Sequence, residues 1–195
     1  GYTQGANNVA EFDITPYIHE GKENRLAVQV FRWSDGSYLE CQDMFRMSGI
    51  FRDVYVYNVP TVSVRDHYIH SEYDGGDNTM HTTTNVELTL DNRNGLSGKK
   101  QIEVSLYDPA GNRVAGEVIT AEFAADKKEV GVVARMELAN PLMWDAENPH
   151  LYTVRVVQKD AEGREEMAFS TKHGFRYIEI KNSLMYVNGE KLRFK

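Results

Sequence analysis

Short segments of alternating apolar and polar residues recur through the second part of the chain, from Thr61 to Phe175. In residues 85–90 (NVELTL) and 101–107 (QIEVSLY), every second side chain is apolar. In an extended chain such side chains share one face, which predicts antiparallel strands with one buried side and one wet side. The predicted core residues of these two segments are Val86, Leu88, Leu90, Ile102, Val104 and Leu106.

Clusters of Gly, Asn, Asp and Pro separate the alternating segments, at residues 74–78, 92–98, 108–112 and 160–163. These residue types accept the backbone angles of tight turns. About seven such strands over roughly 115 residues predict an immunoglobulin-like β-sandwich. The disulfide of true immunoglobulin domains is excluded, because Cys41 is the only cysteine. Helical periodicity is almost absent, so the fold class is all-β.

Before this region, residues 11–15, 24–31 and 51–58 also alternate and are expected to be strands. Pro60 interrupts the pattern and predicts a domain boundary, with one domain over residues 1–59 and the sandwich over 60–174. Residues 175–195 form a third part, in which Asn188-Gly189 indicates a type I′ hairpin turn. The chain begins with Gly1 and ends on a strand-like pattern, so we interpret it as part of a longer protein.

The composition argues against two classes of partner. Net charge is −7, the isoelectric point is about 5.4, and no basic cluster is present. We therefore expect neither nucleic acid nor an anionic membrane as a partner. No segment approaches the ~18–20 apolar residues that span a bilayer. These features do not assign the protein to a cellular compartment.

Charged and titratable residues give few candidates for chemistry. His67 and His70, three residues apart in a strand, are expected on opposite faces and unable to share a metal ion. No zinc-ligand pattern is present. Glu165 and Glu166 alternate faces, and the pair Asp74 and Asp77 belongs to a turn; both pairs are expected to be solvated surface.

The connection RWSDGSYLECQDMFRMSGIF (Arg32 to Phe51) is far longer than the usual loop of about 4–6 residues. It combines aromatic rings with the acids Glu40 and Asp43, which suits a carbohydrate site. The alternative, favoured by the residues alone, is that Trp33, Tyr38 and Phe45 pack under the loop while the acids pair with arginines. Residues 34–37 (SDGS) are expected to form a turn. Outside this loop, Trp144 is expected to close one end of the sandwich.

Three segments of the chain also resemble a known protein family. The segment RWSDGSYLE-QDM-RMSGIFRDV, within residues 1–56, closely resembles the end of the sugar-binding domain of large bacterial β-galactosidases of glycoside hydrolase family 2. NPLMWDAENPHLYTV (140–154) is similar to the family's Pro-x-x-Trp…Pro-x-Leu-Tyr signature, and HGFR (173–176) to its hinge. The resemblance implies a partial jelly-roll, an immunoglobulin-like domain, and the first strands of a truncated TIM barrel.

The resemblance also implies an activity and one site residue. Family members are retaining glycosidases whose two catalytic glutamates would lie beyond Lys195, so no catalytic residue is assigned in this chain. The aspartate of Gln-Asp-Met, here Asp43, would contact the galactose unit and ligate a sodium ion. Cys41 and Phe45 stand where the family commonly has Asp and Trp. Na⁺ and Mg²⁺ are expected in the parent enzyme, with neither bound strongly by this chain alone.

The interpretation is thus a non-catalytic part of an enzyme that hydrolyses terminal β-D-galactosides, with a galactoside as partner. The parent is expected to be a homo-oligomer, and this chain to self-associate through residues 1–59. One alternative is a family 2 enzyme acting on another β-glycoside, such as a glucuronide or mannoside. Another is a β-sandwich carbohydrate-binding or adhesion module with no enzyme attached.

Overall fold

A computed structural model describes residues 1–5, 8–39, 47–76 and 79–193. The chain divides into two compact units, Gly1–Tyr57 and Asn58–Lys195. The boundaries predicted within the second unit, at residues 60, 174 and 175, stay predictions. Among the described residues, no helix has the length and apolar character needed to cross a membrane.

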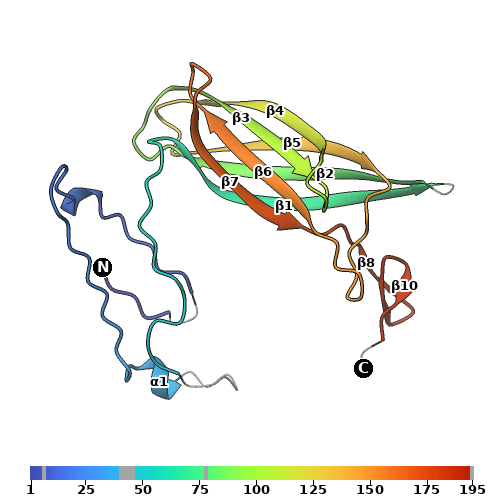
Figure 1. The fold of residues 1–195 in the computed structure, drawn as a ribbon, viewed down its shortest axis with the longest axis horizontal. Coiled ribbons are helices and arrows are strands. Elements are labelled where there is room, and N and C mark those ends of the chain that lie inside the picture. The colour runs from blue at the N-terminus through green and yellow to red at the C-terminus, as the bar shows by residue number, and fades with distance from the viewer. Residues whose placement is uncertain (6–7, 40–46, 77–78, 194–195) are drawn as a thin grey trace. The chain divides into compact units, whose positions relative to one another are not determined.

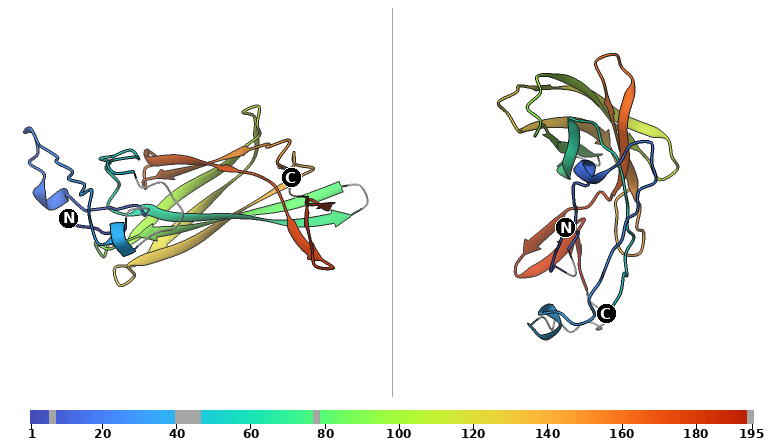
Figure 2. Two further views of the ribbon diagram at one scale, coloured as in Figure 1. Left: turned by 90° about the horizontal axis from the view of Figure 1, so that it is seen from below. Right: turned by 90° about the vertical axis from the view of Figure 1, so that its left-hand side faces the viewer.

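The second unit contains a sandwich of two antiparallel sheets, each drawn as arrows in Figures 1 and 2. One sheet has the order β1-β2-β5, formed by Ser63–Gly76, Thr79–Asp91 and Glu129–Ala139. The other has the order β4-β3-β6-β7, formed by Arg113–Phe123, Gly98–Tyr107, Tyr152–Lys159 and Glu165–His173. These seven strands confirm the predicted sandwich.

The fourth strand distinguishes this sandwich from the constant-type immunoglobulin arrangement. In a constant-type immunoglobulin domain, the fourth strand belongs to the sheet that strands one, two and five form. Here β4 pairs with β3 instead. The carboxylate of Glu117 on β4 then accepts a hydrogen bond from the backbone N–H of Arg135 on β5. An edge strand presents a row of unpaired backbone groups, and this side chain satisfies one of them.

The core lies between the two sheets and follows the period of two. The six predicted core side chains are at most 1% exposed, which confirms the face assigned to each strand. Burying aliphatic side chains of this size stabilises the fold by roughly 1.5–3 kcal/mol each. Further buried members come from β5, β6 and the segment after β7: Ala134, Met136, Tyr152, Val154, Val156 and Phe175.

A buried amide, that of Gln158 on β6, joins the two sheets. Its side chain is 1% exposed. The amide Nε2 donates to the carbonyl of Val62 at 2.7 Å, and Oε1 accepts from the N–H of Val64 at 3.1 Å. Nε2 also donates to Glu166 at 3.1 Å. The start of β1 is therefore bonded to the opposite sheet through one side chain.

A second buried amide, that of Asn92 just after β2, organises the loops at one end of the sandwich. It is fully buried. Its Nδ2 donates to three backbone carbonyls, those of Leu96, Ala124 and Lys127, at 2.8–3.1 Å. Turn segments that lie about 30 residues apart in the sequence are therefore held by one side chain.

A third sheet follows the sandwich. It is an antiparallel meander of β8 (Ile178–Lys181), β9 (Leu184–Val187) and β10 (Glu190–Lys191). Asn188 and Gly189 both have positive φ, 52° and 82°, which confirms the predicted I′ turn. Barrel strands are parallel and alternate with helices. An antiparallel meander therefore does not show the predicted start of a TIM barrel.

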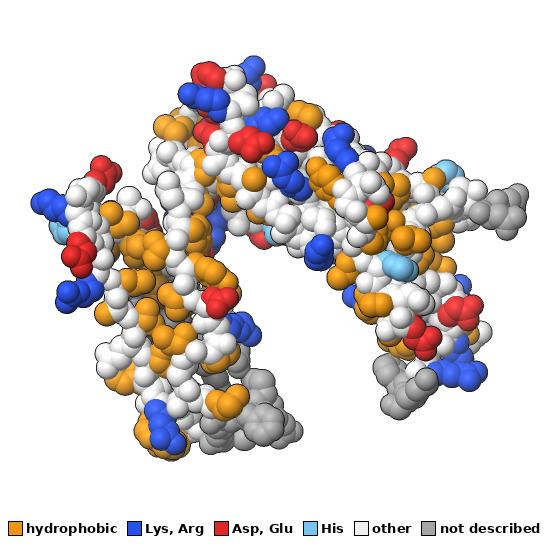
Figure 3. Space-filling view, in the orientation of Figure 1, with side chains coloured by type: hydrophobic (Ala, Val, Ile, Leu, Met, Phe, Trp, Pro, Cys, Tyr) orange, Lys and Arg blue, Asp and Glu red, His pale blue; other side chains and the backbone are white. Residues whose placement is uncertain are grey.

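The first unit differs from the prediction. No strand is found in the described residues of Gly1–Tyr57, which contain only a 3₁₀ turn η1 (Thr15–Tyr17) and a short helix α1 (Gly36–Leu39). The predicted strands, and with them the partial jelly-roll, are not observed. A β-strand forms only when its backbone hydrogen-bonds to a neighbouring strand. Apolar side chains consequently gather on the surface of this unit (Figure 3), including Leu26, Val28, Val30, Phe31, Val54 and Val56.

Replacement of Gln158 by methionine should destabilise the second unit by roughly 2–4 kcal/mol, because two buried backbone groups lose their partner. Urea unfolding of the 195-residue chain measures the loss. Gln101→Met is the matched control, since Gln101 is exposed on β3 of the same sheet, and it should change stability by less than about 0.5 kcal/mol. Equal effects of the two substitutions would contradict the bridging role of Gln158.

Candidate functional site: the aromatic loop and the Trp144 junction

The connection over residues 32–51, called the aromatic loop below, begins with a turn at residues 34–37, as the sequence predicts. The Ser37 N–H donates to the Ser34 carbonyl at 3.0 Å. The Ser37 hydroxyl donates to the Arg32 carbonyl at 3.3 Å and accepts from the Ser34 N–H at 3.2 Å. Gly36 and Ser37 of this turn are also the first two residues of α1. A serine hydroxyl bonding its own backbone in this way favours a turn over continued extended chain.

Trp33 and Tyr38, two aromatic residues of this loop, are exposed. Trp33 is 65% and Tyr38 is 76% exposed, with ring centroids 6.3 Å apart and planes tilted by 30°. The Arg32 guanidinium lies 5.3 Å from the centre of the Trp33 ring, within the range of a cation–π contact. The interpretation that these rings pack under the loop is therefore wrong for Trp33 and Tyr38.

Asp43, the one residue assigned to substrate and metal binding, lies outside the described residues, as do Glu40, Cys41 and Phe45. Its role stays a prediction. Within the described ranges, no group of three His, Cys, Asp or Glu side chains could hold a metal ion.

The two histidines of β1 lie on opposite faces, as their spacing predicts. The His67 ring lies 5.1 Å from that of Phe169 on the opposite sheet. His70 stacks on Tyr68 at 5.2 Å, and its ring bonds the Asn85 amide at 3.3 Å. Each ring therefore has a structural neighbour of its own.

The two acids of β7, Glu165 and Glu166, are both exposed, as predicted, but their partners differ. Glu165 is a surface side chain, 58% exposed and 3.8 Å from Arg155. The side chain of Glu166 is 24% exposed; it pairs with Lys100 at 2.7 Å and accepts from buried Gln158. A register irregularity between Gln158 and Lys159 separates the two environments. Glu166 also lies at the surface, and its side chain takes part in the inter-sheet bridge as well.

Trp144 lies where the sandwich meets the third sheet. Its N–H donates to the Phe175 carbonyl at 2.7 Å, and the Arg176 guanidinium lies 4.7 Å from its ring centre. Gly174 leaves room for the indole, because a Cβ there would lie 3.1 Å from the Trp144 side chain. The expectation that Trp144 closes one end of the sandwich agrees with this position. The contacts to Arg176 and to the third sheet were not predicted.

Beside this junction, the side chain of His173 on β7 contacts β1 of the opposite sheet. Its Nε2 lies 2.9 Å from the Ser71 hydroxyl of β1, and its ring meets Phe175 edge-on at 4.9 Å. Burial lowers the pKa of His173 below its ordinary value, because the surroundings disfavour the charged ring. Tyr73 of β1, whose pKa burial raises, faces Tyr177 with ring centroids 5.5 Å apart.

Family comparisons agree with this architecture. The pattern described as "Glycosyl hydrolases family 2, sugar binding domain" matches residues 1–60, and the pattern "Glycosyl hydrolases family 2" matches residues 62–176. The second alone covers more than half of the chain. The chain belongs to glycosyl hydrolase family 2.

Relatives of this family 2 chain are bacterial proteins named β-galactosidase. One from Priestia megaterium is 39% identical over 98% of the chain, and one from Halalkalibacterium halodurans is 37% identical over all of it. The chain spans 18% of the length of each.

Solved structures support the fold. A glycosyl hydrolase family 2 member from Bacteroides cellulosilyticus superposes with a TM-score of 0.63 at 18% identity, over 70% of this chain and 19% of that one. A β-glucuronidase from Parabacteroides merdae gives 0.55 at 22% identity, over 68% of this chain and 16% of that one. At these identities the likeness concerns the fold alone.

The lowered pKa of His173 predicts a pH dependence. Below its unfolded pKa of about 6.5 the unfolded chain binds the proton more readily than the folded chain, so stability falls as pH falls from there. His173→Gln, which cannot be protonated, should lose less stability than the unmodified chain between about pH 7.5 and pH 5. Urea unfolding at each pH measures this. Exposed His81 provides the control substitution, and identical slopes for all three proteins would contradict the prediction.

Proposed function

We propose that this chain is a non-catalytic part of a retaining β-galactosidase that hydrolyses terminal β-D-galactosides. The observation that carries the proposal is 39% identity, over nearly the whole chain, to a protein named β-galactosidase. The loop motif RWSDGSYLE-QDM supports it, because that motif resembles the galactosidase branch of family 2. The catalytic carboxylates would belong to the part of the enzyme that this chain does not span.

The proposed role of the aromatic loop rests on Asp43. A carboxylate is a hard oxygen donor, which suits both an alkali cation and the hydroxyl groups of a sugar. Asp43 would orient the galactose unit directly and through sodium. Mg²⁺ would be held by other parts of the enzyme. The exposed rings of Trp33 and Tyr38 stand on the same loop.

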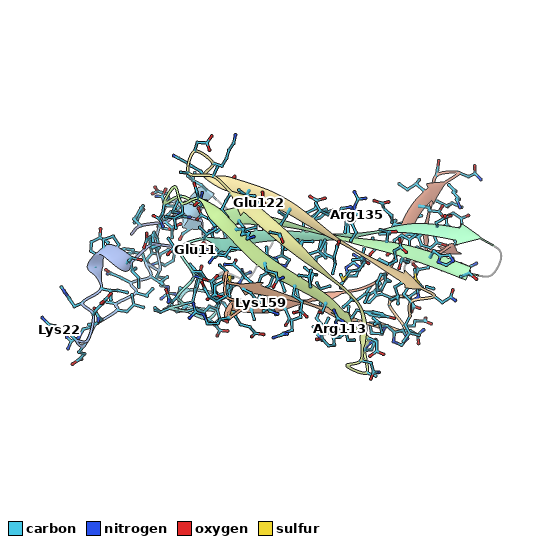
Figure 4. All side chains as sticks on the ribbon, turned by 90° about the horizontal axis from the view of Figure 1, so that it is seen from above. Glu11, Lys22, Arg113, Glu122, Arg135 and Lys159 are labelled. Carbon is cyan, nitrogen blue, oxygen red and sulfur yellow. The ribbon has the colours of Figure 1, made fainter. Side chains whose placement is uncertain are left out.

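We propose that the sandwich acts as a spacer between the first unit, which contains the aromatic loop, and the chain that follows the sandwich. Several charged side chains on its surface bond partners on neighbouring strands. Lys159 bonds Glu103 at 2.9 Å across neighbouring strands, and Lys172 donates to Thr153 at 2.8 Å. Figure 4 labels Arg113 and Lys159 on strands of this sheet. Such pairing is typical of a solvated face.

Neither alternative has an observation that favours it over the galactosidase. The likeness to β-glucuronidases is one of fold and does not choose a sugar. A free-standing carbohydrate-binding module would not explain the match of both family patterns in sequence order. Homo-oligomer formation by the parent remains part of the proposal. Self-association of this chain does too, its basis being the exposed apolar side chains of the first unit.

Asp43→Asn in the full-length enzyme should lower galactoside turnover and weaken its dependence on sodium together, because the substitution removes the charge that would serve both. Steady-state rates at a series of sodium concentrations measure this. Asp35→Asn, in the turn of the same loop, is the matched control. Unchanged kinetics across sodium concentrations would contradict the role of Asp43.

The 195-residue chain alone should show no turnover of a chromogenic galactoside, and clear turnover would contradict the assignment as non-catalytic.

A further inference from the structure

The side chain of Asn188 bonds two different parts of the second unit. Its Oδ1 accepts from the Tyr177 N–H at 3.1 Å, and its Nδ2 donates to the Trp144 carbonyl at 2.9 Å. Its own N–H donates to the Tyr177 carbonyl at 3.0 Å. Asn188 belongs to the turn between β9 and β10, whereas Trp144 belongs to the connection between β5 and β6. One amide thus bridges the third sheet and the sandwich.

The Trp144 side of this bridge is held by further hydrogen bonds. The N–H of Leu142 donates to the hydroxyl of buried Tyr152 at 2.9 Å, which ties the connection to β6. Asp145 accepts from the N–H groups of Glu147 and Asn148 at 2.8 and 2.6 Å. The connection is therefore held from both directions, and the Trp144 carbonyl has a fixed position.

The third sheet has little of its own to hold it together. Its strands have four, four and two residues, and sheets this small are marginal in water. Ile178 and Ile180 are 54% and 74% exposed, so β8 buries little apolar surface. Apart from Asn188, the junction contributes the stacking of Arg176 on Trp144 and of Tyr177 near Tyr73.

We propose that Asn188 is a latch that fastens the third sheet to the end of the sandwich and so fixes the direction in which the chain leaves it. The family 2 pattern ends at residue 176, whereas this latch makes residues 177–191 part of the same unit.

The chain offers a matched pair of substitutions. Asn182, in the turn between β8 and β9, has φ of 50°, close to the 52° of Asn188. Within the described residues, the Asn182 side chain forms no hydrogen bond. Glycine accepts positive φ without strain, so Asn188→Gly and Asn182→Gly should preserve both turns equally. Only Asn188→Gly removes the bonds to Trp144 and Tyr177.

Trp144 supplies a local reporter, because Trp33 is the only other tryptophan. In a Trp33→Phe background, acrylamide quenching of Trp144 fluorescence should increase in Asn188→Gly and stay unchanged in Asn182→Gly. Hydrogen exchange of the β8–β10 amides should accelerate on the order of tenfold or more in Asn188→Gly, because two hydrogen bonds are lost. The β2 amides should keep their protection.

A second variant, Asn188→Asp, keeps a turn-forming residue but replaces the donor to the Trp144 carbonyl with an acceptor oxygen. It should accelerate exchange in β8–β10 as Asn188→Gly does. Equal exchange in the Asn188 and Asn182 variants would overturn the proposal. Loss of protection throughout β2 would overturn it as well, because the contact would then support the sandwich itself.

Discussion

The pair of hydrogen bonds between the Gln158 amide and the backbone of Val62 and Val64 is the constraint on which the sandwich depends. Apolar burial brings two sheets together but sets no unique alignment, since it is non-directional. The Gln158 bonds are directional, and they join the start of β1 to β6 across the core. The Glu166–Lys100 pair holds the same amide from the other side. This bridge is thus a directional contact between the two sheets, beside their apolar packing.

The same device recurs at the other joints of the second unit. Asn92 holds the loops at one end through three backbone carbonyls, and Asn188 holds the third sheet at the junction with Trp144. An amide side chain both donates and accepts, so it can replace the pairing that a missing strand neighbour would give. These joints are consistent with the spacer role that we propose for the sandwich.

The sequence predicts those features that local pattern determines. Alternation in residues 85–90 and 101–107 identifies the buried faces, and Asn188-Gly189 identifies its turn, because each depends on neighbouring residues. Gln158 shares the buried face of β6 with Val154 and Val156 in the structure, and its partners lie 94 and 96 residues away. No local pattern encodes such a contact. Strands predicted before Tyr57 fail for the same reason, because a strand depends on a partner. Asp43 was assigned by resemblance alone and lies outside the described residues.

Native-state hydrogen exchange of the Val64 amide tests the central claim most directly. If the Gln158 bridge holds β1 against the opposite sheet, this amide should exchange only when the whole unit unfolds, with the same free energy of opening as the core amides of β2. Exchange of Val64 at the faster rate of a fraying edge strand, well before global unfolding, would contradict the account.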